Sequence, residues 1–381
     1  MRVAVVSDWF LPRFGGIELQ IRDLALELQS RGCVVVLHTS TPGPANVGGV
    51  HVARLPTIRA PYFGFAISPG LISAIRTEVA RGAYDVVHTH VSIVSPLAYA
   101  SIIAARQLGL PNLVSFHSPL GGKEYLLKLS QHLTQWANWP SLAITAVSER
   151  VASELRSALP GATISILPNG ADTKFWQAPR APAHDHFSIF TALRLQRRKR
   201  PLALLRAFHK AQSMATRRLT LQIAGAGPDY HKLTRYIARH HLTDVTLLGL
   251  QSREALRSLY AQSDLFVLPS RREAFGLAAL EARCALLPVI AMRCAGCADF
   301  LVTQRASQIL VADDTELAVR MAQLSGEPKL GEQLGTYDCA LDRYDWKNVA
   351  AAHLALYRQI AAKTDAQSAH AEERRMPAFA D

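Results

Sequence analysis

Long hydrophobic runs and cysteine frameworks are both missing from this chain of 381 residues. No apolar stretch reaches the roughly 18 residues that a helix needs to span a bilayer, so no transmembrane helix is predicted. The first apolar run, Val3–Val6, ends at Ser7 and Asp8, and we expect no secretory signal there. Five cysteines, an odd number in a long chain, do not predict a set of disulfides. We therefore expect a protein of the reducing cytoplasm.

Acidic residues are outnumbered by basic ones. The chain has 42 Lys and Arg against 30 Asp and Glu, which gives a net charge of +12. Such an excess favours anionic partners: nucleotides, anionic phospholipid or nucleic acid. The densest run, 193–218, holds nine basic residues and no acid, and a solvated basic face is the plainer interpretation of it. Because it lacks a series of interleaved aromatic residues for base stacking, we expect no nucleic acid partner.

Short β-branched apolar runs alternate with longer amphipathic stretches through most of the chain. Several runs are apolar on both faces, which is typical of buried parallel strands, and helices such as 17–30 and 96–107 are predicted between them. This alternation predicts an α/β fold with parallel sheets and helices on both faces. The predicted strands are 3–6, 34–37, 50–55, 86–90, 113–117, 142–147, 164–167, 188–193, 220–224, 245–248, 265–268, 289–291 and 309–311.

The alternation of strands and helices stops once, at Gln177–His186, where two prolines and no apolar periodicity indicate a linker. We therefore expect two Rossmann-like domains, 1–178 and 187–344, with a ligand site in the cleft between them. An amphipathic helix is predicted over 345–364 and a disordered tail over 365–381.

The segment Arg272–Glu281 carries the clearest chemical signal. It follows the predicted strand 265–268, and Gly276 stands where a helix should begin. Free N–H groups at a helix N-terminus attract phosphate. Glu273 and Glu281 flank that point, roughly 10 Å apart on a helix, and carboxylates suit vicinal hydroxyls. This layout fits a nucleotide sugar, with hydroxyl-rich hexose, diphosphate and ribose; the alternative is a pair of solvent-facing helix acids.

The same segment resembles the E-x(7)-E motif of family 4 glycosyltransferases, which are retaining enzymes of the GT-B fold. Further segments resemble that family's motifs in its order along most of the chain. They are the glycine loop Gly15–Glu18, the I-x-N-G run Ile166–Gly170, the R-L-x-x-x-K element Leu193–Lys199, the G-x-G-P loop Gly225–Pro228, the strand Val245–Gly249 beside the base and the start of the final helix at Arg343–Trp346.

The resemblance implies two Rossmann-like domains facing across a cleft, with the final helix crossing back to the first domain. It implies transfer of a sugar from a UDP- or GDP-sugar, as co-substrate, to a lipid-linked or saccharide acceptor in cell-envelope or glycoconjugate synthesis. The sequence lacks a D-x-D pair for a nucleotide-bound metal, as is usual for GT-B enzymes, so we expect no metal and no other cofactor. We expect a cytoplasmic protein that contacts the inner face of the membrane.

Donor-binding residues follow from the resemblance, residue by residue. Arg194 and Lys199 would neutralise the leaving diphosphate, the first as a planar fork and the second as a point charge. Glu273 would hold the sugar and Glu281 the ribose, whereas Arg197, Arg198 and Arg200 are expected to be surface charges. The remaining expected donor contacts are Gly15, Gly16, Gly225, Gly227, Leu248, Phe275, Gly276 and Leu277.

His117 closes the predicted strand 113–117, and the family's pattern places a histidine there beside the reacting sugar. Together with Glu273, Arg194 and Lys199 it completes the expected catalytic set. His88 and His90 raise the alternative of a zinc site with His117, but the sequence shows no obvious carboxylate partner for it. The C-x-x-C pair Cys294/Cys297 is expected to be structural, because no second pair accompanies it.

Two positions depart from the family's pattern. Leu286 stands where the family has Gly in A-x-G-x-P-V-I-A, and Ala295 replaces the first Gly of its G-G-x-x-E. An Ala in place of Gly restricts close backbone approach, which affects the sugar end of the site more than the phosphate end.

Three alternatives stay open. The basic stretch Gly121–Trp139, with Lys123, Lys128, His132 and Trp136, is either a membrane-surface helix or a packed domain helix. The enzyme is either a glycosyltransferase or a non-hydrolysing sugar-nucleotide epimerase of GT-B fold, which would need carboxylates as acids and bases. The non-enzymatic alternative is a basic protein that binds nucleic acid or anionic membrane.

Overall fold

The chain folds into two compact α/β units. Unit 1 comprises Met1–Gly170 and Trp346–Asp381, and unit 2 comprises Ala171–Asp345. The computed structural model describes residues 1–13, 15–58, 68–92, 94–122, 127, 139–179, 185–301, 310–327 and 339–373.

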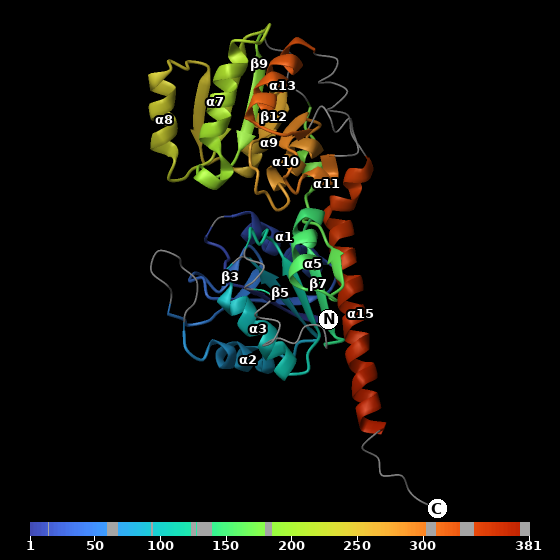
Figure 1. Ribbon diagram of the computed structural model, residues 1–381. Helices are drawn as coiled ribbons and strands as arrows, with labels where there is room; N and C mark the ends of the chain where they lie inside the picture. Colours follow the sequence, from blue (N-terminus) through green and yellow to red (C-terminus); the bar gives the residue numbers. More distant parts are fainter. Residues whose placement is uncertain are drawn as a thin grey trace, which may run out of the picture. The chain divides into compact units, whose positions relative to one another are not determined.

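Unit 1 is built on an eight-stranded sheet (Figure 1). Its strands are β1 (Arg2–Ser7), β2 (Val34–Thr39), β3 (Asn46–Val47), β4 (Val50–Arg54), β5 (Val86–Val91), β6 (Asn112–Phe116), β7 (Leu142–Ala146) and β8 (Ile164–Ile166). Their order is β3-β4-β2-β1-β5-β6-β7-β8, and only β3–β4 is antiparallel. Each strand predicted in this half is present, and the added β3 is too short to give a periodic signal.

Alternate residues of the sheet in unit 1 face two different helix layers. Its helices are α1 (Gly16–Ser30), α2 (Leu71–Arg81), α3 (Pro96–Gln107), α5 (Glu149–Ala158) and α15 (Trp346–Glu373). Val3 and Val5 of β1 lie in a core with α1 and with Tyr357 of α15, whereas Ala4 and Val6 lie in a core with α2 and α3. This period of two, with both faces covered, explains why the strands read as continuous apolar runs.

Unit 2 is built on a six-stranded, fully parallel sheet. Its strands are β9 (Phe187–Ala192), β10 (Leu219–Ala224), β11 (Val245–Gly249), β12 (Leu265–Leu268), β13 (Val289–Met292) and β14 (Leu310–Val311), in the order β11-β10-β9-β12-β13-β14. The chain moves outward from β9 on one side and then returns to its other side with β12. The β9/β12 boundary is therefore the topological switch point, where open α/β sheets bind ligands.

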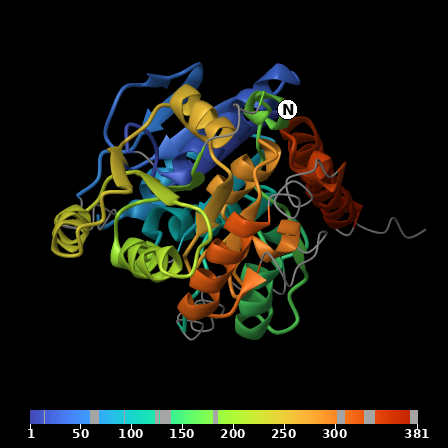
Figure 2. The same cartoon turned by 90° about the horizontal axis from the view of Figure 1, so that it is seen from above.

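The helices of unit 2 follow its strands in turn. They are α6 (Thr173–Trp176), the 3-10 helix η2 (Arg197–Lys199), α7 (Pro201–Gln212), α8 (Tyr230–Arg239), α9 (Arg253–Gln262), α10 (Leu277–Cys284), α11 (Ala298–Leu301), α13 (Asp314–Gly326) and the 3-10 helix η3 (Cys339–Tyr344). Helices α7 and α13 lie side by side (Figures 1 and 2). Arg200 joins their starts, because its guanidinium donates to both carboxylate oxygens of Asp314 at 2.7 and 2.8 Å. Arg200 is thus a half-buried ion-pair residue and not the surface charge that we expected.

The boundary between the units differs from the expected one at residue 178. It lies at Gly170/Ala171, because the short helix α6 belongs to unit 2. Ala171 bridges to Asp345, Thr173 donates a 2.5 Å hydrogen bond to the Asp345 carboxylate, and Trp176 packs edge-on against Tyr260. Pro179 of the predicted linker belongs to unit 2, in the segment that follows α6, and residues 180–184 of that linker lie outside the described residues.

The final helix is longer than predicted. It runs to Glu373, so the expected disordered tail beginning at residue 365 is wrong for its first nine residues. Residues 365–373 are rich in Ala, Gln and Glu, which are strong helix formers, so the helix propagates beyond the turns that pack on the core. The predicted basic helix Gly121–Trp139 lies almost wholly outside the described residues, as does the chain after 373.

Candidate functional site

Two predicted site residues meet at the switch point of unit 2. Lys199 ends η2 after β9, and Glu273 lies in the turn after β12. Lys199 Nζ is 2.6 Å from Glu273 Oε2, and their side chains are only 21% and 12% exposed. The loops after the two central strands are thus joined by a largely buried ion pair.

The turn that carries Lys199 is held in place by its neighbours. Arg200 adopts a left-handed conformation with φ of +61°, and Pro201 then opens α7. The Arg200 guanidinium donates to the Pro269 carbonyl at 3.1 Å, and the Ser270 hydroxyl lies 3.4 Å from the Lys199 carbonyl. The turn after β12 therefore contacts the turn after β9. These contacts fix the position of the Lys199 backbone.

Gly225 and Gly227 have a packing role that the sequence did not reveal. A Cβ on Gly225 would lie 1.9 Å from the Leu193 carbonyl oxygen, and one on Gly227 would lie 2.4 Å from the Leu195 carbonyl oxygen. Leu195 N also donates to Ala226 O at 2.9 Å. The glycines let the loop after β10 press against the backbone that carries Arg194. Arg194 itself is exposed between two buried leucines, and Arg197 and Arg198 are exposed as expected.

Gly276 opens α10 with a φ of +91°, a conformation that favours glycine. A Cβ there would lie 3.1 Å from Cys297 Cβ, so the turn is also crowded. No side chain caps this helix start, which leaves the N–H groups of the first turn directed out of the helix end. Phosphate oxygens are natural partners for such groups, because the helix dipole adds to the hydrogen bonds.

Glu281 lies one turn into α10 beside a residue that the sequence did not single out. Tyr260 Oη is 3.1 Å from Glu281 Oε2 and also 3.1 Å from the Ala278 carbonyl oxygen. Burial raises the pKa of Tyr260 well above its usual value, and the Glu281 charge adds to this effect. The phenol therefore stays neutral and can donate to the carboxylate. A lone Tyr on a helix gives no sequence signal for such a role.

The remaining residues that were predicted to contact the donor differ in how far their side chains are exposed. Phe275 is buried in an aromatic cluster with Phe300 and Tyr344, at ring distances of 5.4 and 5.8 Å. Its side chain is therefore part of the core, and only its backbone could serve a ligand. Leu277 and Leu248 are partly exposed, the first at the start of α10 and the second in the edge strand β11.

The glycine loop of unit 1 forms the start of α1. Gly15 is its N-terminal cap in an extended conformation, and no side chain caps the helix. Arg13 lies 3.8 Å above the Trp9 ring and 3.5 Å from the buried Glu18 carboxylate. This helix start, like that of α10, therefore presents backbone N–H groups that suit an anion.

His117 follows β6 and does not stand alone. Its Nε2 is 2.7 Å from Nδ1 of His90, which lies near the end of the neighbouring strand β5. Burial, together with His353 of α15, lowers the pKa of His117 to about 4. His117 is therefore a neutral hydrogen-bonding group at neutral pH. Sequence reasoning considered His90 only as a metal ligand and missed this contact.

His88 is the other histidine of β5 that the sequence offered as a zinc ligand. His88 Nδ1 is 2.7 Å from Tyr357 Oη and its Nε2 is 2.8 Å from Ser115 Oγ, so both ring nitrogens are engaged. Within the described ranges, no group of three or more His, Cys, Asp or Glu is placed to hold a metal ion. In the C-x-x-C pair, Cys297 is buried and its thiol pKa is raised by burial, which disfavours a reactive thiolate.

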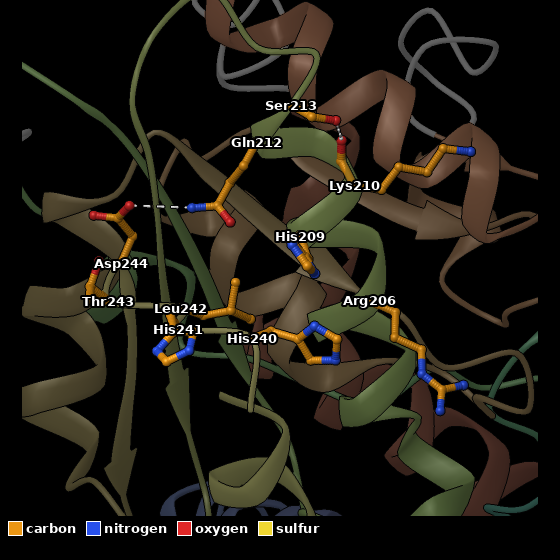
Figure 3. Close-up of a pocket in the computed structure, with 10 residues that line it drawn as sticks. All are labelled: Arg206, His209, Lys210, Gln212, Ser213, His240, His241, Leu242, Thr243 and Asp244. Carbon is orange, nitrogen blue, oxygen red and sulfur yellow. Dashed lines mark hydrogen bonds between the residues drawn. The ribbon is translucent and has the colours of Figure 1, made fainter. Parts of the chain in front are cut away.

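A hollow of about 600 Å³ lies elsewhere in unit 2 (Figure 3). It is bordered by the ends of α7 and α8, with His209 and His240 rings 5.1 Å apart and Asp244 opposite Gln212. Asp244 directly precedes β11, so the hollow lies at the amino ends of the strands. The residues of unit 2 that are predicted to bind the donor lie after the carboxyl ends of its strands or in the helices that follow. None of them lines the hollow.

Two protein-family models match consecutive parts of the chain. Residues 14–175 match the family model described as Glycosyltransferase Family 4, and residues 172–338 match Glycosyl transferases group 1. The chain belongs to the group 1/family 4 glycosyltransferases. The resemblance seen in the motifs is thereby confirmed over most of the chain.

Relatives and solved structures agree with this family. The chain is 29% identical over 304 residues to a phosphatidylinositol N-acetylglucosaminyltransferase subunit of Arabidopsis thaliana, covering 76% of this chain and 67% of the relative. It is 26% identical over 383 residues to the GDP-mannose:cellobiosyl-diphosphopolyprenol alpha-mannosyltransferase of Xanthomonas oryzae, covering 94% and 96%. A structure of Anabaena Alr3699/HepE in complex with UDP and glucose matches with a TM-score of 0.73 at 20% identity, covering 92% and 98%. The predicted GT-B class, with two Rossmann-like domains, is confirmed.

Proposed function

We propose that this glycosyltransferase moves a hexose from a UDP- or GDP-sugar to a lipid-linked or saccharide acceptor, with retention at the anomeric carbon and without a metal. The observation that carries the proposal is the Lys199–Glu273 pair at the switch point of unit 2. A cation and a carboxylate are held there in the turns that follow the two central strands of a Rossmann-like sheet, which is where such sheets bind nucleotides.

Each end of the donor would have its own partners. Arg194 and Lys199 would bind the diphosphate, and the uncapped start of α10 at Gly276 would add backbone N–H groups. Glu281 would accept hydrogen bonds from the ribose hydroxyls, and Glu273 from the hexose. In unit 1, the amides of Gly15 and Gly16 would contact phosphate and His117 would lie beside the reacting sugar.

The chemistry would depend on the leaving group. As the bond between sugar and diphosphate breaks, negative charge grows on the phosphate oxygens, and Arg194 and Lys199 would stabilise it. The acceptor hydroxyl would attack from the same face, and the departing phosphate would take its proton. Such a route needs no separate general base, and the neutral His117 fits a hydrogen-bonding role better than a proton-transfer role.

The relatives and the charge favour an acceptor at a membrane. Their names include phosphatidylinositol and a diphosphopolyprenol-linked saccharide as acceptors. The net charge of +12 would attract the chain to anionic lipid on the cytoplasmic face. No described helix is long and apolar enough to cross a bilayer.

A donor panel tests the proposal. Purified protein is mixed with UDP-, GDP- and ADP-sugars, and thermal unfolding is recorded. A donor at 100 times its dissociation constant should stabilise the protein by about 2.7 kcal/mol. The matching donor is then incubated with polyprenyl- and phosphoinositide-linked acceptors, and proton NMR reads the anomeric configuration of the product.

Two outcomes would contradict parts of this proposal. Turnover that is lost in excess EDTA and restored by Mg²⁺ or Mn²⁺ would exclude the metal-free route. Epimerised nucleotide sugar, formed without any acceptor, would favour the epimerase alternative over glycosyl transfer.

A further inference from the structure

Arg200 has a backbone conformation that is unfavourable for a residue with a side chain. It lies between η2 and α7 with a φ of +61°, in the left-handed region. A glycine adopts this conformation freely, whereas a Cβ makes it costly. Such conformations persist where surrounding contacts impose them, and the side chain of Arg200 makes contacts of this kind.

The Arg200 guanidinium links three segments of unit 2. One terminal nitrogen donates to the Pro269 carbonyl at 3.1 Å, in the turn after β12. The other donates to both carboxylate oxygens of Asp314, at 2.7 and 2.8 Å, in the first turn of α13. The Arg200 side chain is only 20% exposed, so water competes little for these bonds. The turn after β9 is thereby tied to the turn after β12 and to the helix that follows β14.

Asp314 is available for this contact because its neighbour caps the helix. The Asp313 carboxylate accepts from the backbone N–H groups of Thr315 and Glu316, both at 2.9 Å. The cap of α13 therefore does not need the Asp314 carboxylate, whose charge is favoured near a helix N-terminus. Asp313 holds the helix start, and Asp314 holds Arg200.

Lys199 is anchored at both ends of its side chain. At its tip, Nζ lies 2.6 Å from Glu273 Oε2. At its base, Lys199 N donates to Gln196 O at 2.8 Å, and the Lys199 carbonyl oxygen lies 3.4 Å from the Ser270 hydroxyl. Lysine is a flexible point charge, so the place where its backbone is fixed decides where the ammonium group can reach. Because Arg200 is the next residue, a shift of Arg200 moves this base directly.

We infer that Arg200, held by Asp314, is a positioning residue that sets Lys199 for the donor diphosphate. The inference rests on the proposed function in one respect, which is that Lys199 binds the diphosphate. The guanidinium of Arg200 is engaged by Pro269 and Asp314, and this role needs no contact between Arg200 and the donor. Its loss would leave the Lys199 ammonium group present but no longer confined to one place.

Arg200→Gly separates positioning from folding. Glycine accepts a φ of +61° without strain, so the turn can still form, but the guanidinium is gone. We expect kcat to fall about tenfold, less than the roughly 10²–10³-fold expected for Lys199→Ala, because the cation is displaced and not removed. The KM for the donor should change less than kcat, since the contact to the diphosphate would strengthen in the transition state. Asp314→Asn keeps the shape and removes the charge, and it should lower kcat about threefold.

A double-variant cycle shows whether Arg200 acts through Lys199. In a Lys199→Ala background, Arg200→Gly should lower kcat no further, because the cation that Arg200 positions is already gone. A full additional loss of about tenfold in the double variant would overturn the inference, since Arg200 would then act by another route. Wild-type kcat in Arg200→Gly would overturn it as well.

Asp244→Asn is the matched control for loss of an Arg–Asp pair. Arg218 donates to Asp244 Oδ1 at 2.9 and 2.6 Å, also within unit 2. These two residues directly precede β10 and β11, so their pair lies at the amino ends of strands, whereas Lys199 follows a carboxyl end. Asp244→Asn should keep the kcat of wild type. A loss equal to that in Asp314→Asn would contradict a specific role for the Arg200 pair.

A measurement on Lys199 itself needs no sugar transfer. Lysines are acylated with a succinimidyl ester, and mass spectrometry reads the rate at each residue. Lys199 should react slowly in wild type, because its side chain is 21% exposed and paired with Glu273. It should react faster in Arg200→Gly, with Lys210 and Lys232 of the same unit unchanged.

The labelling separates failure of the inference from failure of the proposed function. Equal Lys199 rates in wild type and Arg200→Gly would overturn the positioning role, even in an active enzyme. A faster Lys199 reaction in Arg200→Gly, combined with a wild type that neither binds nucleoside diphosphate nor transfers sugar, would contradict the proposed function. The hold of Arg200 on Lys199 would then still stand.

Discussion

Units 1 and 2 place charge in opposite ways at the carboxyl ends of their strands. In unit 1, β5 and the residue that follows β6 carry the neighbouring histidines His88, His90 and His117, all with a pKa lowered by burial. In unit 2, the turns after β9 and β12 carry the ion pair Lys199–Glu273, with the exposed Arg194 nearby in sequence. One sheet ends in neutral hydrogen-bonding rings and the other in permanent charges.

Under the proposed function, this difference would separate two tasks of a glycosyl transfer. A diphosphate keeps its negative charge through the reaction, and permanent cations match it. Sugar hydroxyls are neutral, and a neutral imidazole can donate to them without bringing an uncompensated charge into a buried place. The comparison predicts that pH acts mainly on unit 1, whereas charge-removing substitutions act mainly through unit 2.

Acid should act on unit 1 with the largest effect. His38, His117 and His353 have a pKa lowered to about 4, and those of His88 and His90 are lowered well below the usual 6.5. As pH falls from about 6.5 to 4, the unfolded chain binds protons that the folded unit does not, so stability is lost. Each histidine costs up to about 1.4 kcal/mol of unfolding free energy per pH unit. Above pH 7.5 the effect should vanish.

Buried cysteines report on each unit separately. Cys33 is buried in unit 1 and Cys284 in unit 2. Labelling with an acid-active disulfide reagent, read by mass spectrometry from pH 7.5 to 4.5, should modify Cys33 at a higher pH than Cys284. The described histidines of unit 2 are all at least partly exposed, which is why its response should be weaker. Simultaneous labelling of both cysteines at every pH would contradict the comparison.

Removal of the diphosphate cations should have the next largest effect. Arg194→Ala and Lys199→Ala should each lower kcat by roughly 10²–10³-fold, because the proposed contacts to the diphosphate would strengthen as charge grows on the leaving group. The effect on kcat should exceed the effect on KM. The double variant should lose less than the product of the single losses, since both cations stabilise the same charge. Steady-state kinetics with the donor found by the panel measures all three.

Arg197 and Arg198 are internal controls for these cations. Both are exposed on η2, one turn or less from Lys199, and carry the same charge. Their alanine variants should keep turnover near that of wild type. Equal losses in all four variants would reduce the segment to a diffuse basic patch, and wild-type turnover in Arg194→Ala and Lys199→Ala would remove the leaving-group assignment.

Glu281→Ala should weaken nucleotide binding more moderately. If the Glu281 carboxylate accepts from the ribose hydroxyls as proposed, its loss should cost roughly 1.5–3 kcal/mol, the range for hydrogen bonds to a charged group. Calorimetric titration with the nucleoside diphosphate measures this without any acceptor. Binding equal to that of wild type would show that Glu281 does not hold the ribose.

The sequence predicted the strands well because buried parallel strands leave a local signature. The runs 86–90 and 113–117 match β5 and β6 closely, and every residue of both strands is buried. The boundary between the units was harder to predict from the sequence. The prolines after Gln177 are visible in sequence, whereas the packing of Trp176 on Tyr260 that assigns α6 to unit 2 depends on residues far apart in the chain.

The side-chain pairs that the sequence did not predict in the site are contacts between residues far apart in the chain. Lys199 and Glu273 were predicted from the motifs, but their ion pair depends on the turns after β9 and β12 lying next to each other. The bond between His90 and His117 depends in the same way on the pairing of β5 with β6. Spacing along one chain gives residue types and their order, and it carries no register between neighbouring strands.

Tyr260→Phe should have the smallest effect among these charged and neutral partners. The phenol is fully buried and its ring packs against Phe190 and Trp176, so the ring of Phe should keep these contacts. Only the donor to Glu281 or to the Ala278 carbonyl is lost, which costs about 1 kcal/mol, or roughly fivefold, in nucleoside diphosphate affinity. If Tyr260 acts by orienting the carboxylate, the variant should add nothing further once Glu281 is alanine, in a double-mutant cycle measured by calorimetry. A full additional loss in the double variant would mean that Tyr260 supports the nucleotide site by another route, and unchanged affinity in the single variant would show that Glu281 holds its position without the phenol.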